Sequence, residues 1–224
     1  MARLQLSVVI IGIVVTFAGS GLIERWRVAR EVRATMLLVH AELETNRADF
    51  MQVWDYQQWE MRACKFLTDN RRDLKRIPSD TLASFDPVYG RIHFFHPRRD
   101  AFEVLKNSGL MSSVPDKDFL LAVTQGYAVL ADLEENISMY YQLKLTAQND
   151  MSKDFSEKQR ERFYTGDMYE RWECIFSVLC FAEFMLTAPY YFPEGYIEGL
   201  LADVDRSIRA IEAKYKLDKK PTDD

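Results

Sequence analysis

The chain has 224 residues, 48% of them hydrophobic and 28% charged, and it carries a formal net charge of −5. This mild acidity argues against nucleic-acid binding by the domain as a whole. Its 3 cysteines form no CxxC pair, so neither a disulfide framework nor a structural zinc site is indicated.

Residues 4–23 contain no charged side chain. At a helical rise of about 1.5 Å per residue this run spans a hydrocarbon core of about 30 Å, so residues 1–23 are predicted to form a transmembrane anchor. A cleavable signal peptide is the alternative because small residues occupy positions 18–21, but its apolar core is expected to be only about 7–15 residues long. Four arginines follow the run and favour a cytoplasmic location for the body of the chain by the positive-inside rule: Arg25, Arg27, Arg30 and Arg33.

Small residues recur every four positions within the anchor, at Gly12, Thr16 and Ser20. Such a face lets two membrane helices approach closely, so we expect the chain to self-associate through it. The alternative is that small residues are simply common in membrane helices.

The segment after the anchor opens the predicted domain, residues 24–217. No proline or glycine occurs between Ile23 and Pro78, and apolar residues recur in steps of three and four, so one helix is predicted to run to about Arg76. A break near residues 46–49, where the stripe thins, is the alternative. Trp26 suits the membrane–water interface.

Turn residues crowd residues 78–97, which are predicted to be an irregular loop. Helices are then expected over residues 98–108, with Gly109 as a left-handed cap, and over residues 113–145. Residues 150–166 are expected to form a solvated helix or connector.

Residues 168–186 are strongly apolar and are predicted to be the central core helix of a bundle. A second membrane span is the alternative, but Glu173 and Glu183 bracket too short an uncharged run. Residues 194–217 predict an amphipathic last helix, and residues 218–224 a polar tail. The fold class expected is therefore all-α, with a transmembrane helix continuing into a long helix and a domain of four to five bundled helices.

A basic excess surrounds the predicted loop: seven basic residues stand against three acidic ones between Arg71 and Arg99. An anionic partner is expected there, either an acidic protein, a phosphate-bearing ligand or lipid headgroups. The alternative is a solvated polar cap that pairs with acidic neighbours. The residues of this predicted cationic surface are Arg91, His93, His96, Arg98 and Arg99.

The spacing His93-x-x-His96 is the only one in the chain that is typical of a metal site, and it lacks a further ligand of defined position. His40 has no ligand partner evident in the sequence. No catalytic triad order, phosphate-binding loop or di-metal spacing occurs, so no catalytic residue, metal or cofactor is predicted.

The layout resembles that of a group of single-span bacterial membrane proteins without a defined activity. The resemblance covers chiefly the first 145 residues and includes the basic, Trp-bearing exit at 24–27 and a Leu-x-x-Ser-Gly-Leu element at 105–110. It implies a single-pass protein of the bacterial inner membrane and carries over no catalytic residue.

The first functional hypothesis is a membrane-anchored, non-enzymatic interaction or scaffold protein. The alternative is a sensor that binds a small molecule between helices and relays the response along the long helix. An enzyme is the least favoured class because no site is recognisable.

Overall fold

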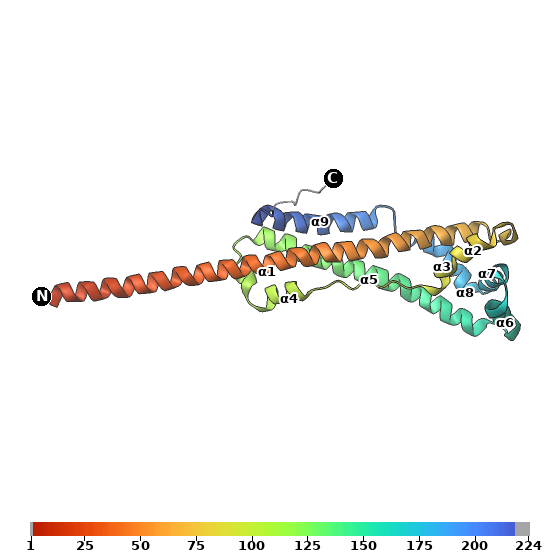
Figure 1. Ribbon diagram of the computed structural model, residues 1–224, viewed down its shortest axis with the longest axis horizontal. Coiled ribbons are helices and arrows are strands. Elements are labelled where there is room, and N and C mark those ends of the chain that lie inside the picture. The colour runs from red at the N-terminus through yellow and green to blue at the C-terminus, as the bar shows by residue number, and fades with distance from the viewer. Residues whose placement is uncertain (1, 218–224) are drawn as a thin grey trace. The chain divides into compact units, whose positions relative to one another are not determined.

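A computed structural model describes the backbone of residues 2–217 and the side chains from Gly21 onward (Figure 1). Within residues 2–217 the fold is all-helical, without a β-strand. The side-chain positions of the predicted association face at Gly12, Thr16 and Ser20, and the whole tail at 218–224, lie outside the described part of the chain. The helices are α1 (Ala2–Asp69), α2 (Ser79–Ser84), α3 (Asp86–Gly90), α4 (Asp100–Asn107), α5 (Lys117–Asp154), α6 (Glu157–Thr165), α7 (Met168–Ser177), α8 (Leu179–Thr187) and α9 (Tyr196–Tyr215), with 3₁₀ turns at Leu74–Arg76, Leu110–Ser113 and Ala188–Tyr190.

The long first helix is confirmed. α1 has 68 residues and is about 100 Å long at a rise of about 1.5 Å per residue, and no break occurs at residues 46–49. It ends at Asp69, earlier than the predicted Arg76. The backbone N–H and the side-chain amide of Asn70 both donate to the carbonyl of Phe66, and a turn follows.

Most later boundaries differ from the prediction. α2 and α3 occupy the first part of the predicted loop at 78–97, and only the chain that follows them is extended. α5 begins at Lys117 and not near 113, because the Asp116 carboxylate accepts from the backbone N–H of Phe119 and caps the helix. Gly109 takes the predicted left-handed conformation, with φ of 74°.

The apolar segment 168–186 is not one helix. α7 and α8 meet at 93°, and Val178 between them has extended backbone angles. The domain therefore has more helices than the four or five predicted. Within residues 21–217, whose side chains are described, no single helix is long and apolar enough to cross a membrane. Taken together as a bent pair, α7 and the segment Leu179–Tyr190 are long and apolar enough.

The chain divides into two compact units, and α1, α5 and α9 each contribute to both. Unit 1 comprises Met1–Thr45, Arg98–Tyr127 and Val204–Asp224, and unit 2 comprises Asn46–Pro97 and Ala128–Asp203. Each unit therefore joins stretches that are far apart in sequence, which only tertiary packing can bring together.

Unit 1 buries one face each of α1, α5 and α9. A side chain at Gly126 would place its Cβ 2.6 Å from Oγ of Ser207, so glycine permits the close approach of α5 and α9. The Glu42 carboxylate of α1 accepts from the backbone N–H groups of Ala101 and Phe102 at the start of α4 and from the hydroxyl of Tyr127. Buried apolar residues of this unit include Met36, Val39, Leu43, Leu105, Val123, Val204 and Ile211.

Unit 2 has an aromatic core. Trp54 of α1 contacts Phe192 edge to face at a centroid distance of 5.3 Å, and the buried Trp172 of α7 donates its indole N–H to the carbonyl of Leu82 at 3.3 Å. Other buried members of this core are Phe50, Phe95, Tyr140, Tyr141, Phe163, Phe181 and Phe184.

Candidate functional site

A lysine and a glutamate are fully buried against each other in unit 2. Lys144 of α5 donates from Nζ to Oε1 of Glu60 on α1 and to the carbonyl oxygen of Arg91. Neither side chain of the pair has any exposed surface. Since an unpaired buried charge is costly, each residue depends on the other for its place in the core.

Further polar groups surround this pair without hydrogen-bond partners in the described part of the chain. They are both amide atoms of Gln57, the hydroxyl of Tyr140 and Nε2 of His93, while the hydroxyl of Tyr141 lies close enough to the Glu60 carboxylate to hydrogen-bond to it. Gln57 precedes Glu60 by one helical turn, and the two tyrosines precede Lys144 by one turn, so each set lies on one face of its helix. We call Gln57, Glu60, Tyr140, Tyr141 and Lys144 the buried polar cluster.

Burial controls the charges of this cluster. It raises the pKa of Glu60 to about 7 in spite of the neighbouring Lys144, and it lowers the pKa of Lys144 in spite of Glu60. It also raises the pKa of Cys64, one turn beyond Glu60, which keeps that buried thiol protonated and unreactive. The lysine of this cluster, which has no exposed surface, cannot reach a substrate from solvent.

Sequence reasoning missed the buried polar cluster. The available signal was that Trp54, Gln57, Glu60 and Cys64 follow one another in steps of three and four, which places two polar residues on the buried stripe of α1. The partner Lys144 could not be found in this way, because its position relative to α1 depends on tertiary packing.

The five residues of the predicted cationic surface are distributed over both units. Arg91, His93 and His96 belong to unit 2, and Arg98 and Arg99 belong to unit 1. All three arginines are exposed.

The two histidines of that surface have different surroundings. The ring of His93 packs on Tyr56 at a centroid distance of 4.1 Å, and burial, Arg91 and Lys144 lower the pKa of His93. His96 is exposed, with Nδ1 3.0 Å from the carboxylate of Glu134. Among the described residues they form no metal-binding group with a third ligand.

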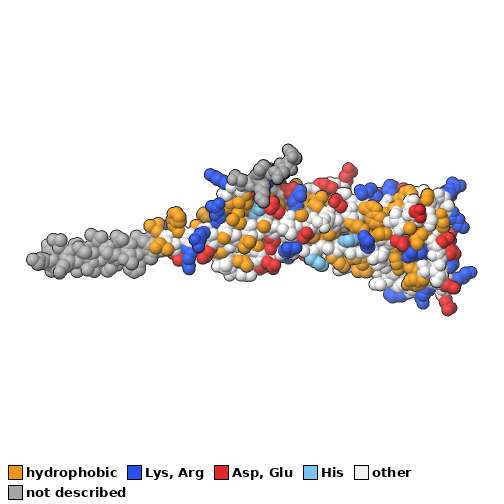
Figure 2. Space-filling model, in the orientation of Figure 1, with side chains coloured by type: hydrophobic (Ala, Val, Ile, Leu, Met, Phe, Trp, Pro, Cys, Tyr) orange, Lys and Arg blue, Asp and Glu red, His pale blue; other side chains and the backbone are white. Residues whose placement is uncertain are grey.

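Large apolar side chains are exposed where α1 leaves the described core of unit 1. Leu22, Ile23 and Trp26 are all exposed, with Trp26 at 79%. Basic side chains lie among them, and Arg27 pairs with Glu24 at 2.6 Å. Figure 2 shows this mixture of hydrophobic and basic side chains beside the atoms drawn in grey. Exposed apolar groups rimmed by charge are typical of an interaction surface.

No family model, curated protein or solved structure matches the chain. Its function is therefore inferred from its own residues.

Proposed function

We propose that the chain is a membrane-anchored, non-enzymatic interaction protein whose first helix is both its anchor and the framework of its helical units. The observation that carries this proposal is the continuity of α1. The uncharged run at 4–23 and the buried stripe that packs in both units belong to one helix, Ala2–Asp69, without a linker. A helix without a flexible joint fixes the orientation of what it carries relative to the bilayer.

The exit from the proposed anchor supports a membrane interface. Tryptophan prefers the headgroup region, and exposed arginines attract anionic lipids, so Trp26 and the arginines from Arg25 to Arg33 suit that place. We place the protein in the bacterial inner membrane as a single-pass protein, with its helical units in the cytoplasm.

Fractionation tests the anchor. We expect the full chain to resist carbonate extraction from membranes and Ile11→Asp to lose this resistance, because an acidic group at the bilayer centre costs about 2.5–3.5 kcal/mol. Leu121→Asp, which changes an exposed leucine of α5, is the matched control and should stay in the membrane. Extraction of the unaltered chain, or an intact mass that shows loss of the N-terminal segment, would contradict the proposal.

We further propose that two copies associate through Gly12, Thr16 and Ser20. Crosslinking in membranes should give a dimer that Gly12→Leu reduces, since a larger side chain separates the helices. Equal crosslinking in both proteins would exclude this face.

The predicted cationic surface is proposed to bind an acidic protein or an anionic ligand. Changing Arg91, Arg98 and Arg99 to Glu should then remove a partner in a pull-down.

The buried polar cluster favours a second candidate function, a sensor. Two of its residues, Gln57 and Glu60, lie on α1, the helix that also carries the proposed anchor, and polar groups buried without hydrogen-bond partners are uncommon unless they serve a function. In a sensor, Glu60→Gln should change the crosslinking yield at the anchor. In a scaffold, the yield should remain that of the unaltered chain.

A further inference from the structure

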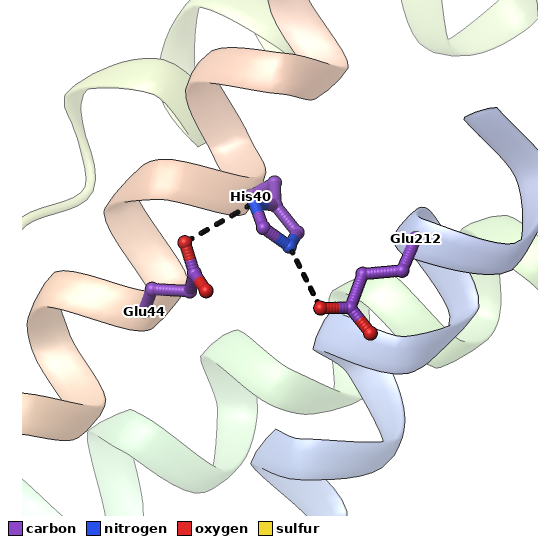
Figure 3. Close-up of side chains that lie close together, drawn as sticks. All are labelled: His40, Glu44 and Glu212. Atoms are coloured by element: carbon purple, nitrogen blue, oxygen red, sulfur yellow. Dashed lines mark ion pairs between the residues drawn. The ribbon is translucent and has the colours of Figure 1, made fainter. Parts of the chain in front are cut away.

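One histidine of α1 lies between two carboxylates, one from its own helix and one from α9 (Figure 3). Nδ1 of His40 is 3.3 Å from Oε2 of Glu44, and Nε2 is 3.5 Å from Oε1 of Glu212. All three residues belong to unit 1. Elsewhere in the described chain, no three His, Cys, Asp or Glu residues bring their ligand atoms together as closely, within 4.8 Å.

The two sides of the imidazole differ. The side chain of His40 is 13% exposed and that of Glu212 26%, whereas Glu44 is 55% exposed. Nε2 of His40 is buried and makes no hydrogen bond, although the Glu212 carboxylate faces it. A buried ring nitrogen that makes no hydrogen bond is available to a metal ion as a ligand.

The distance between Nε2 of His40 and Oε1 of Glu212 fits a metal ion bound by both atoms. Nitrogen and oxygen ligands lie about 2.0–2.2 Å from Zn²⁺, and a tetrahedral angle then separates them by about 3.4 Å. The 3.5 Å between Nε2 of His40 and Oε1 of Glu212 agrees with this value. Because the nitrogens of one imidazole point in different directions, the same ion cannot also be bound through Nδ1.

We propose that His40 and Glu212 are ligands of a divalent first-row transition-metal ion such as Zn²⁺, and that Glu44 orients the imidazole through Nδ1. Imidazole and carboxylate donors suit this class of metal, and a carboxylate on the second nitrogen fixes the tautomer and the ring orientation. Two carboxylates beside a neutral imidazole also supply the charge that balances a divalent cation. Water completes the coordination beside Glu212, whose side chain is 26% exposed.

Metal binding at this position would connect α9 to α1 within unit 1. An ion bound only by the folded chain stabilises it by mass action. In the absence of a metal, the alternative for this cluster is a protonated His40 paired with both glutamates. Added zinc would not stabilise an ion-paired cluster of this kind. A rise in melting temperature with zinc therefore distinguishes the metal site from the ion-paired alternative.

The test uses the full, untagged chain in detergent after removal of metal with a chelator. Calorimetric titration with ZnCl₂ should show one site per chain, and zinc should raise the melting temperature. His40→Gln and Glu212→Gln should each abolish this rise and weaken binding at least about a hundredfold, while Glu44→Gln should weaken it about tenfold, as expected for an orienting partner. Glu31→Gln, which changes an exposed glutamate of α1 in the same unit, should bind like the unaltered chain.

Failure to bind zinc, or unchanged affinity in both His40→Gln and Glu212→Gln, would overturn the proposal. Circular dichroism of the metal-free variants shows whether they fold. If they do not, the Co²⁺ spectrum of the unaltered chain decides, because ligation by nitrogen and oxygen in a tetrahedral site gives intense visible bands. A spectrum like that of aqueous Co²⁺ would contradict the site regardless of the variants.

Discussion

Removal of the Lys144 amine tests whether the Glu60–Lys144 pair holds the core of unit 2 together. In Lys144→Met the carboxyl of Glu60, which is fully buried, loses its cation. The carbonyl of Arg91 loses its donor in the same change. Breaking a buried pair from one side costs about 3–5 kcal/mol, a large part of a typical stability of about 5–15 kcal/mol.

The double variant Glu60→Leu/Lys144→Met distinguishes the attraction between the two side chains from the cost of burying their charges. Since both charges are removed together, no buried group is left unpaired, and replacement of buried pairs by apolar residues is often neutral or stabilising by about 1–4 kcal/mol. We therefore expect the double variant to be more stable than either single variant. Lys65→Met is the matched control. Lys65 pairs with Asp69 at 3.2 Å on the exposed face of α1, the helix that carries Glu60, and its loss should have no measurable effect on stability.

Urea denaturation of the full chain in detergent, followed by circular dichroism and by tryptophan fluorescence, gives these free energies where the two transitions coincide. A Lys144→Met variant within about 1 kcal/mol of the unaltered chain would refute the reasoning, because this is well below the cost of a broken buried pair. A double variant no more stable than the sum of the single changes would also refute it, since the two residues would then not interact.

Three further predictions follow from single contacts. Burial raises the pKa of Glu60 to about 7 from an ordinary value of 4.5, so the folded state binds more protons than the unfolded state between these pH values. The free energy of unfolding should therefore fall as the pH rises from about 4.5 to about 7. Urea denaturation across this range should show this pH dependence in the unaltered chain and lose it in Glu60→Gln. Gly126→Ala should lower the stability by about 1–3 kcal/mol because the new Cβ meets Ser207. Gly199→Ala, with no atom within 4 Å of its Cβ, should instead stabilise α9 by up to about 1 kcal/mol. Equal effects of the two changes on the melting temperature would contradict the close approach of α5 and α9. Glu42→Leu should lower the free energy of unfolding by at least about 1–3 kcal/mol, since two backbone N–H groups and the Tyr127 hydroxyl lose their acceptor. Amide hydrogen exchange in α4 should become faster. Unaltered exchange at Ala101 and Phe102 would exclude this capping role of Glu42.

Three features could be predicted from local sequence: the helical fold class, the continuity of α1 and the left-handed turn at Gly109. Each depends on signals within a few residues: the absence of proline and glycine, an apolar residue every third or fourth position, and a glycine where positive φ is needed. The missed start of α5 is also a local matter, since the residue that caps the helix is Asp116 and not one near position 113.

Three other features depend on tertiary packing: the break at Val178, the division into two units and the partners of the polar side chains. Val178 is neither proline nor glycine, and its extended backbone separates two helices whose apolar faces are both buried. Glu60 meets Lys144, and His40 meets Glu212, across long stretches of chain. Periodicity identifies which face of a helix is buried, but which other helix covers that face depends on the packing of the whole chain, so a buried charge can be located in the sequence before its partner can be named.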